Sequence, residues 1–313
     1  MQFTTLGRTG LKVSVAGLGC GGSSRIGMFK YGVDHAAGIV RSAYDLGVNF
    51  FDTAHGYGTE PAVGKGLEGI KRDSYVLSTK YPSRNFTKDD DDFGKLLEQS
   101  LKSLKTDYLD ILHFHGVRPE DYDTVVEKLL PKMEKAKKEG KLRFMGVTEI
   151  FNSDTTHEML KKALDQDLWD VIMVGYNIIN PTAVNNVLKM TMEKNVGTLC
   201  MYAVRAALSN PEQLKIDIAK ILDAGKGDPK LLPRENTLDF LVKDGTAASI
   251  MEAAYRFCRH TKGIDVFLTG TSSADHLKDN IASILKPKLP DEILEKLDAM
   301  FGSVDIVSGE LIE

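Results

Sequence analysis

Cysteine is scarce in this chain of 313 residues: only Cys20, Cys200 and Cys258 occur, far apart and without a CxxC pair. An odd number of isolated cysteines offers neither a disulfide framework nor a paired thiolate metal motif. A reduced, intracellular protein is the simplest fit, and we predict a cytoplasmic location.

Long apolar runs are also missing. No stretch of the sequence approaches the roughly 18 consecutive apolar residues that a membrane-spanning helix requires. The amino-terminal residues Met1 to Thr5 carry no basic segment followed by an apolar one, which is the pattern of a secretory signal. We therefore expect neither membrane insertion nor secretion.

An excess of positive charge is absent as well, because 40 lysines and arginines face 44 aspartates and glutamates, for a net charge of −4. This balance gives no electrostatic reason to bind nucleic acid or an acidic membrane. What is present, 42% hydrophobic and 27% charged residues, is typical of a soluble globular protein. The length suits one barrel-sized domain, so we predict a single domain over residues 1–313 and leave its oligomeric state open.

Strand-like and helix-like patterns alternate along the chain. Apolar, β-favouring runs occur near Val13, Asn49, Val76, Leu109, Leu142, Val171, Val196 and Val266. Helical spacing is expected over residues 33–47, 59–67, 87–104, 121–139, 153–164, 181–194, 247–261 and 274–285. The alternation predicts a parallel sheet with right-handed crossovers, and eight such units favour a closed (β/α)8 TIM barrel over an open sheet.

Three further segments extend this barrel. Residues 2–14 alternate and turn between Gly7 and Gly10, which predicts a β-hairpin before a first core strand at Val13 to Gly19. The segment 202–247, between the seventh strand and its helix, is unusually long, and we predict an extra helix over 211–225. A carboxyl-terminal helix is expected at 291–301, with a tail that packs across the barrel mouth.

The strongest local signal lies where three successive strands end. An apolar strand ends in Asp52, and Tyr57 follows in a turn bracketed by two glycines. The next two strands end in Lys80 and His115. Because the carboxyl ends of neighbouring parallel strands meet at one edge, we expect these four side chains to converge there.

These four residues suit proton transfer to a carbonyl oxygen. A tyrosine hydroxyl ordinarily has a pKa near 10, so it transfers a proton poorly at neutral pH unless its anion is stabilised. Unit charges about 4 Å apart at an effective dielectric of about 20 interact by about 4 kcal/mol. The Lys80 ammonium alone would therefore be enough to stabilise the tyrosine anion, and Asp52 would orient that ammonium. Tyr57 would act as general acid or base, with His115 bonding the substrate oxygen. No side chain supplies a hydride, so a nicotinamide cofactor is required.

The motifs FDTAHGYG, TEPAVGKGL, YVLSTK and DYLDILHFHG resemble the aldo-keto reductase family of nicotinamide-dependent oxidoreductases, and GKLRFMGV and FLTGTSSADHLKDNIAS extend the resemblance along the chain. The resemblance implies that Asp52, Tyr57, Lys80 and His115 occupy the catalytic positions of an enzyme. DILHFHG is also similar to the aldose or L-galactose dehydrogenase-like branch. That likeness implies a small carbonyl, alcohol or sugar substrate, interconverted with an alcohol or lactone.

The same resemblance implies cofactor contacts at Gly21, Thr148, Glu149, Met201, Tyr202, Ala203, Arg205, Gly270, Thr271, Ser272, His276, Asp279 and Asn280. Glu149 stands where the family commonly has an asparagine, so we expect a carboxylate close to the nicotinamide. Gly270 and His276 stand where relatives that prefer NADP often carry a lysine and an arginine. We therefore predict that NAD(H) is favoured; Lys278 or Arg205 would supply the cation if NADP(H) is used instead.

Two other functions are kept open. His113 and His115 share one face of a strand and could bind a metal ion, as in metal-dependent barrel hydrolases. The remaining histidines that could complete such a site, His157, His260 and His276, fall on or beside predicted helices, so we expect no metal site. Some aldo-keto reductase relatives, such as potassium-channel β subunits, act mainly as nicotinamide-binding regulatory partners, but the four intact positions favour an enzyme.

A glycine pattern, GxGxxG at Gly17 to Gly22, resembles the dinucleotide fingerprint of an open α/β sheet. That fingerprint must run straight into a helix, whereas the first helical pattern here begins near Val33. We interpret these glycines as a barrel loop near the cofactor and expect residues 23–32 to shape one wall of the substrate pocket.

Overall fold

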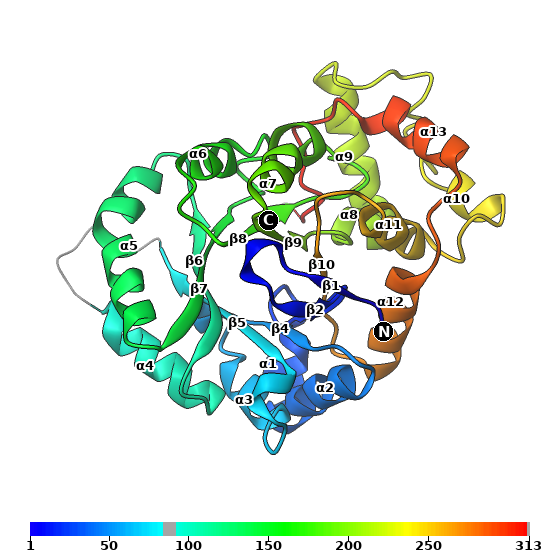
Figure 1. Ribbon diagram of the computed structural model, residues 1–313. Coiled ribbons are helices and arrows are strands. Elements are labelled where there is room, and N and C mark those ends of the chain that lie inside the picture. The colour runs from blue at the N-terminus through cyan, green and yellow to red at the C-terminus, as the bar shows by residue number, and fades with distance from the viewer. Residues whose placement is uncertain (84–91, 312–313) are drawn as a thin grey trace.

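The computed structural model of the protein describes residues 1–83 and 92–311. At its centre eight parallel strands form a closed barrel in the order β10, β3, β4, β5, β6, β7, β8, β9 (Figure 1). The strands are β3 (Ala16–Gly19), β4 (Phe50–Asp52), β5 (Val76–Pro82), β6 (Leu109–Val117), β7 (Leu142–Glu149), β8 (Val171–Gly175), β9 (Gly197–Met201) and β10 (Val266–Thr269). This confirms the predicted (β/α)8 architecture.

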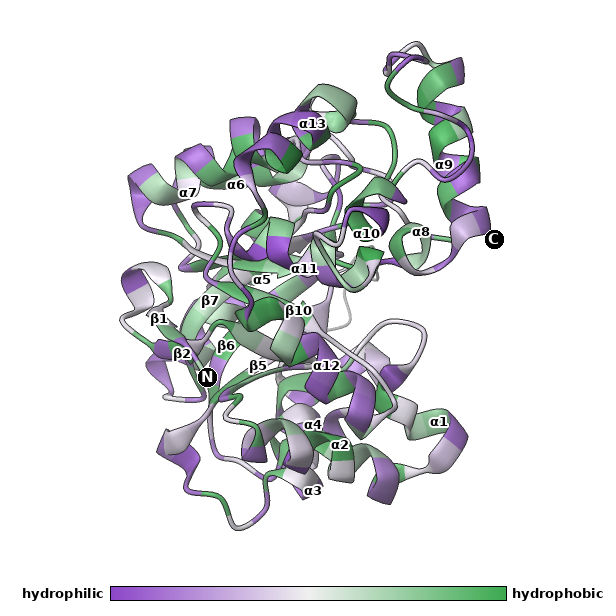
Figure 2. Ribbon diagram, turned by 90° about the vertical axis from the view of Figure 1, so that its right-hand side faces the viewer, coloured by the Kyte–Doolittle hydropathy of each residue, from purple (hydrophilic) through white to green (hydrophobic). Residues whose placement is uncertain are grey.

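Helices cover the outside of the barrel and follow the strands in order. They are α2 (Val33–Asp45), α3 (Glu60–Gly66), α4 (Phe93–Leu104), α5 (Tyr122–Lys138), α6 (Glu158–Gln166), α7 (Lys189–Lys194, after a π-helical segment Val184–Leu188), α11 (Ile250–Arg259) and α12 (Ala274–Leu285). Figure 2 shows apolar stretches on the strands and polar stretches on the surrounding helices. The expected start of the helix at Thr87 lies outside the described residues. None of the helices in residues 1–83 and 92–311 combines the length and the hydrophobicity of a membrane span.

Successive side chains of each strand point to opposite sides of the barrel wall, because the side-chain period of a strand is two. Phe50, Val76 and Ile111 belong to the apolar cluster inside the barrel, whereas Leu77 and Leu112 pack in the layer between strands and helices. This alternation decides which polar side chains reach the interior.

An amino-terminal hairpin closes the barrel at the end opposite to the carboxyl ends of its strands. Its strands are β1 (Phe3–Thr5) and β2 (Lys12–Ser14), which pair in antiparallel fashion. Leu6 is fully buried in the inner cluster, and the guanidinium of Arg8 donates to the Trp169 carbonyl at 2.6 Å, just before β8. The predicted hairpin is therefore confirmed, but the expected strand Val13 to Gly19 is divided, because its first residues belong to the hairpin.

The long segment after β9 contains the predicted extra helix, together with two short helices that the sequence pattern did not predict. It contains α8 (Ala206–Ser209), α9 (Pro211–Asp223) and α10 (Phe240–Lys243), which share a second apolar cluster with α13 (Asp291–Phe301). The tail after α13 is fixed by two buried asparagines of the loop after β8. Asn177 Nδ2 donates to the Ser308 carbonyl at 3.0 Å, and Asn180 Nδ2 donates to the Val307 carbonyl at 2.9 Å.

Helix α6 begins five residues later than the pattern predicts. His157 has a left-handed backbone conformation, with φ of +62°, which the sequence pattern does not reveal. The carboxylate of Asp154 accepts hydrogen bonds from the Glu158 and Met159 amides, so it satisfies the first free donors of the helix. The polar segment before Glu158 is therefore a capping loop.

The loop after β3 differs from the expectation in its backbone. It forms a 3-10 turn, Arg25–Gly27, and a short helix, α1 (Met28–Tyr31), so helical structure begins before Val33. Arg25 and Ile26 have φ values of +40° and +49°. Left-handed backbone at such residues costs about 1 to 3 kcal/mol each, and it persists only where packing enforces it. The Ile26 side chain is fully buried, which supplies that packing.

Asp217, on α9, gives a stability prediction because its carboxyl is buried with few partners. Gln213 Nε2 donates to Oδ1 at 3.2 Å, and Oδ2 has no hydrogen-bond partner among the described residues. Burial raises the pKa of Asp217 to about 6. The folded protein then binds more protons than the unfolded chain between about pH 4 and pH 6, so stability is lost as the pH rises through that window.

We expect Asp217→Asn to remove this loss. The variant should gain about 2 kcal/mol in free energy of unfolding over the wild type at pH 7, and the gain should shrink as the pH falls toward 4. Urea unfolding at several pH values measures both. Asp223→Asn, at an exposed position of the same helix, is the matched control and should change little. A gain that is independent of pH would contradict the burial argument.

Candidate active site

An ion pair between neighbouring strands lies at the centre of the site. Lys80 Nζ lies 2.5 Å from Asp52 Oδ2, and both side chains are almost fully buried. The strand register explains this pairing, because Asp52 stands opposite Ser78 and Lys80 lies two residues further along the same face. Ser78 Oγ donates to the other carboxylate oxygen at 2.9 Å. Both carboxylate oxygens are thus satisfied, and the ammonium is fixed in orientation.

Burial and pairing act against each other at this ion pair. Burial favours the neutral amine, but the Asp52 carboxylate and the nearby Tyr57 outweigh it and leave the pKa of Lys80 raised. Burial also raises the pKa of Asp52, with the Lys80 charge opposing it. Lys80 donates a second hydrogen bond to the Thr53 carbonyl at 2.7 Å. The proton therefore stays on Lys80, and the ammonium remains a fixed positive charge.

Tyr57 lies in a 3-10 turn, His55–Tyr57, directly after β4. Gly58 ends the turn with a φ of +70°, which glycine adopts readily, whereas Gly56 needs no such freedom. A second glycine, Gly21 in the loop after β3, permits the close approach of the ring. A Cβ atom at Gly21 would lie 2.5 Å from the Tyr57 ring, a distance that only glycine allows.

The phenol of Tyr57 meets the ends of the next two strands. Its hydroxyl lies 3.2 Å from His115 Nε2, and the two rings are in edge contact with centroids 5.2 Å apart. Lys80 Nζ lies 4.9 Å from the centroid of the Tyr57 ring. The structure therefore brings together the four side chains that the strand pattern predicts to converge.

His113 lies one layer deeper inside the barrel. Its ring packs against Gly146, where a Cβ atom would lie 2.3 Å from Nδ1, and neither ring nitrogen has a hydrogen-bond partner among the described residues. Burial, and then the charge of Lys80, lower the pKa of His113 well below its ordinary value. Among residues 1–83 and 92–311, no cluster of three or more His, Cys, Asp or Glu side chains could hold a metal ion.

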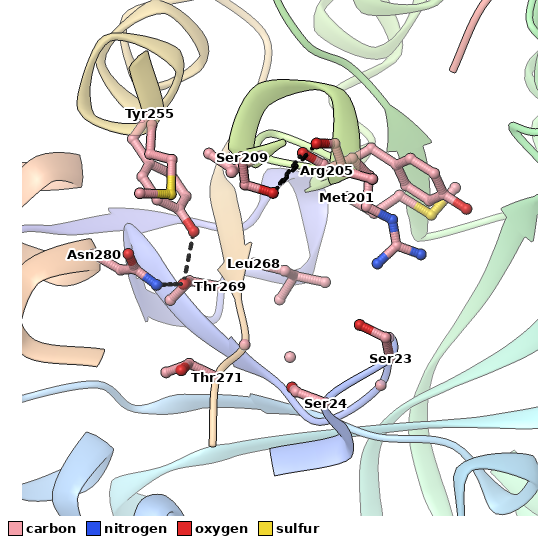
Figure 3. A pocket seen from close by; sticks show the side chains of 18 of the residues that line it. Ser23, Ser24, Met201, Arg205, Ser209, Tyr255, Leu268, Thr269, Thr271 and Asn280 are labelled. Carbon is pink, nitrogen blue, oxygen red and sulfur yellow. Dashed lines mark hydrogen bonds between the residues drawn. The ribbon is translucent and has the colours of Figure 1, made fainter. Parts of the chain in front are cut away.

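A cavity of about 710 Å³ opens beside this site at the carboxyl ends of the strands. It extends from Tyr57 and Asp52 along β9 and β10 to the amino terminus of α12. Of the cofactor positions predicted from sequence, the cavity is lined by Gly21, Met201, Tyr202, Arg205, Gly270, Thr271, His276, Asp279 and Asn280. Figure 3 shows Met201 and Arg205 on one side of the cavity and Thr271 and Asn280 on the other.

The far end of the cavity is organised around Thr269, the last residue of β10. Asn280 Nδ2 donates to Thr269 Oγ1 at 2.9 Å, and the Tyr255 hydroxyl lies 2.8 Å from the same oxygen (Figure 3). Burial raises the pKa of Tyr255 to about 12, so the phenol stays neutral. Tyr255 was not predicted as a site residue, because the sequence shows only that it belongs to the apolar face of a helix.

Four of the predicted cofactor positions do not line this cavity: Thr148, Glu149, Ala203 and Ser272. Thr148 Oγ1 accepts from the Gly116 amide at 2.8 Å. Ala203 is buried in the layer between strands and helices, and the Ser272 carbonyl lies 2.7 Å from His35 Nε2. These groups already have partners inside the protein.

The Glu149 carboxylate is likewise turned away from the cavity, in contrast to our expectation. Its oxygens lie 3.0 and 2.9 Å from His157 Nδ1, and one accepts from the Gly175 amide at 2.7 Å. The reason is strand alternation: Thr148 continues the inward face of β7, so Glu149 points outward toward α6. Burial raises the pKa of Glu149, and the His157 contact opposes this.

Arg205 and the carboxyl-terminal tail meet over the cavity. Arg205 Nη2 lies 2.5 Å from Glu310 Oε2, and the guanidinium lies 4.2 Å from the centroid of the Tyr202 ring. Glu310 and Leu311 both line the cavity. The sequence predicts that the tail crosses the barrel mouth, but it contains no signal that pairs Glu310 with Arg205, because the two residues lie 105 positions apart.

The size and lining of the cavity fit a dinucleotide. Ligand pockets commonly enclose about 300 to 1,000 Å³. Helix α12 begins at the cavity, and the free amides of a helix amino terminus attract phosphate groups. At Gly270 the backbone can approach a ligand closely, because no side chain intervenes. Met201 and Leu268 add an apolar surface to the lining, which suits a flat ring.

Fold and site together define a barrel oxidoreductase, and comparison with known proteins identifies its family. The model of the Aldo/keto reductase family matches residues 20–301. The chain belongs to this family, whose members act on small carbonyl compounds with nicotinamide cofactors.

Particular relatives match nearly the whole chain. L-galactose dehydrogenase of Arabidopsis thaliana is 27% identical over 322 residues, which cover 97% of this chain and 95% of the relative. An aldo-keto reductase from Bacillus halodurans in its holo form superposes with a TM-score of 0.70 at 23% identity and covers 95% of each chain. An aldo/keto reductase from Klebsiella pneumoniae in complex with NADP and acetate also gives 0.70, at 21% identity, with 98% and 100% covered.

Proposed function

We propose that the protein interconverts a carbonyl compound and an alcohol, with a sugar as the preferred substrate class and Tyr57 as the acid and base. One observation carries this proposal: the Tyr57 hydroxyl lies 3.2 Å from His115 Nε2, with the Lys80 ammonium beside the same ring. The nicotinamide cofactor, when bound, supplies or accepts the hydride.

Lys80 would make Tyr57 an effective acid and base in this reaction. A unit charge about 5 Å from a forming phenolate, at an effective dielectric of about 20, contributes about 3 kcal/mol, which the more distant Asp52 carboxylate partly offsets. Two N–H groups of Lys80 donate to Asp52 and to the Thr53 carbonyl. The third N–H group is then available to donate toward Tyr57. When a carbonyl is reduced, Tyr57 gives its proton to the substrate oxygen; when an alcohol is oxidised, it takes that proton.

His115 would position the reacting oxygen. Its Nε2 and the Tyr57 hydroxyl lie within hydrogen-bond distance, so a substrate oxygen placed between them contacts both. At the other end of the cavity, Asn280 donates to Thr269 through its amide nitrogen, so its carbonyl oxygen can accept from an adenine amino group. The free amides at the start of α12 would hold the phosphates.

The sugar assignment rests on two supports. The relative that covers 97% of this chain is a dehydrogenase of L-galactose. The Tyr57 end of the cavity also carries hydroxyl-binding groups, including Ser23, Ser24 and the Arg205–Glu310 pair. Such groups satisfy several substrate hydroxyls at once, whereas a simple alkyl aldehyde would leave them unused.

A substrate panel tests this proposal. L-galactose and other aldoses are offered with NAD+ and NADP+, and simple aldehydes with the two reduced cofactors, while the absorbance of the reduced nicotinamide is followed. We expect the highest kcat/KM for an aldose. If simple aldehydes exceed every sugar by tenfold or more, the sugar assignment is wrong; if no compound turns over while cofactor binds, a regulatory binding protein is the better conclusion.

We also propose that NAD(H) is preferred over NADP(H). A 2′-phosphate carries nearly two negative charges, and arginine is the side chain that matches it best. A side chain at position 270 is blocked, because a Cβ atom there would lie 2.4 Å from the Gly19 carbonyl oxygen. Arg205 is already paired with Glu310, and His276 is the cavity-lining side chain at the start of α12.

We therefore expect His276→Arg to raise the ratio of kcat/KM for NADP(H) over NAD(H) by about tenfold, which corresponds to one charge-assisted contact of about 1.4 kcal/mol. Dissociation constants of both cofactors, from fluorescence titration, provide a second measurement. His260→Arg adds the same side chain away from the cavity and should leave the ratio unchanged. A wild-type protein that already prefers NADP(H) tenfold would refute the preference.

A further inference from the structure

Arg25 lies beside the turn that carries Tyr57, although the two residues are 32 positions apart. Its Nη1 donates to the Tyr57 carbonyl at 2.7 Å and to the Gly56 carbonyl at 3.3 Å. Its guanidinium also lies 5.9 Å from the centroid of the Tyr57 ring, within the range of a cation–π contact. One side chain therefore contacts both the backbone and the ring of Tyr57.

Beyond Arg25, the side chains of the turn have few contacts: the Tyr57 ring meets His115 and Gly21, and His55 Nδ1 lies 3.9 Å from Glu60 Oε2. The turn's own backbone hydrogen bonds are Tyr57 N to the Ala54 carbonyl at 3.0 Å and Gly58 N to the His55 carbonyl at 3.4 Å. No residue of the turn is buried, and a glycine lies on each side of Tyr57. Such a turn is mobile unless another segment fixes it, because glycine adds backbone freedom.

The loop that carries Arg25 is built to fix it. Its strained backbone at Arg25 and Ile26 is held by the fully buried Ile26 side chain. The Phe29 ring lies 5.3 Å from the Arg25 guanidinium and reaches the other side of the turn, 3.3 Å from where a Gly58 Cβ would stand. Backbone strain is retained where the surrounding structure enforces it, and often where function requires a fixed geometry.

We propose that Arg25 is a positioning residue for Tyr57, which holds the turn so that the phenol stays against His115 and Lys80. The inference rests on the proposed role of Tyr57 as proton donor. Arg25 is not among the residues that line the cavity, so it acts through Tyr57 and not through the substrate. Both hydrogen bonds leave from Nη1, whose two N–H groups reach the neighbouring carbonyl groups of Gly56 and Tyr57 at once.

The test uses Arg25→Gln, Arg25→Lys, Tyr57→Phe and the double variant Arg25→Gln/Tyr57→Phe, with 4-nitrobenzaldehyde and saturating reduced cofactor. Arg41→Gln is the matched control, since Arg41 also donates to a backbone carbonyl, that of Glu68, but far from the site. We expect Arg25→Gln to lower kcat by about 10- to 100-fold, as displacement of a reacting group by about 1 Å does, with cofactor affinity within twofold of wild type. Arg25→Lys should recover part of the loss.

The double variant separates positioning from a general structural effect. If Arg25 acts through the Tyr57 hydroxyl, Arg25→Gln should change residual turnover less than twofold once that hydroxyl is gone. Hydrogen exchange of the cofactor-free protein gives a measurement without turnover. The peptide over residues 53–60 should exchange faster in Arg25→Gln and not in Arg41→Gln.

The outcomes separate this inference from the proposed function. An equal loss from Arg25→Gln in both backgrounds, a change in KM alone, or unchanged exchange of peptide 53–60 would overturn the positioning role. Normal turnover of Tyr57→Phe would overturn the proton-donor assignment and this inference with it. Normal turnover of Arg25→Gln, beside an impaired Tyr57→Phe, would overturn only the role of Arg25.

Discussion

Replacing Tyr57 with phenylalanine should lower turnover by about two to four orders of magnitude, the range that a positioned acid or base contributes. The variant keeps the ring, so the edge contact with His115 and the packing against Gly21 are preserved. It loses the hydroxyl that lies 3.2 Å from His115 Nε2. In the proposed mechanism, this hydroxyl donates the proton that is transferred to the substrate oxygen. Because no cofactor contact is removed, the dissociation constant of the cofactor should stay within about twofold.

Steady-state kinetics with the best substrate of the panel measure this change, and fluorescence titration measures cofactor binding. Tyr44→Phe makes the same chemical change on α2, at a residue that does not line the cavity, and should keep normal turnover. Turnover of Tyr57→Phe within threefold of wild type would refute the assignment of Tyr57 as acid and base.

Lys80→Met should damage both stability and activity, because it leaves the Asp52 carboxylate buried without its partner. Removal of one member of a buried ion pair typically costs about 3 to 5 kcal/mol of unfolding free energy. Ser78 would still donate to the carboxylate, but no positive charge would remain beside it. Turnover should fall at least 100-fold, since the fixed charge near the Tyr57 ring is lost.

A second substitution distinguishes the two effects. Asp52→Asn added to Lys80→Met removes the stranded charge, so the double variant should regain most of the lost stability and none of the turnover. Lys65→Met is the matched control: Lys65 pairs with Asp34 at an exposed site, and its loss should cost less than about 1 kcal/mol. A single variant as stable as wild type would contradict the importance of the ion pair, and recovery of turnover in the double variant would exclude Lys80 from the chemistry.

Much of the fold could be predicted because its signals are local. Eight apolar strand patterns, each followed by a helical one, predict a closed parallel barrel, and the amino-terminal hairpin has its own alternation and glycine turn. Errors occurred at boundaries. The run from Val13 to Gly19 crosses from hairpin to barrel without a break in hydrophobicity, and α6 starts late because His157 adopts a left-handed backbone.

Within the site, the sequence reveals the residues at strand ends, since parallel strands bring their carboxyl ends to one edge. Asp52, Lys80 and His115 follow from that rule, and Tyr57 follows from its place in the next turn. Glu149 shows the limit of the rule. It also stands at a strand end, but strand alternation directs its carboxylate outward to His157. The carboxylate therefore does not face the cavity, where the nicotinamide contact was predicted.

The architecture, the convergence of the four side chains and the need for a nicotinamide can thus be read from local patterns in the chain. The partners of the site residues cannot: Arg25 contacts the turn of Tyr57, Ser78 donates to Asp52, and Glu310 pairs with Arg205. Periodicity encodes which face of an element is buried, whereas a single contact between distant loops depends on backbone angles and on the path of each loop. The local sequence around an arginine in a glycine-rich loop is the same whether its side chain hydrogen-bonds to a turn or extends into water.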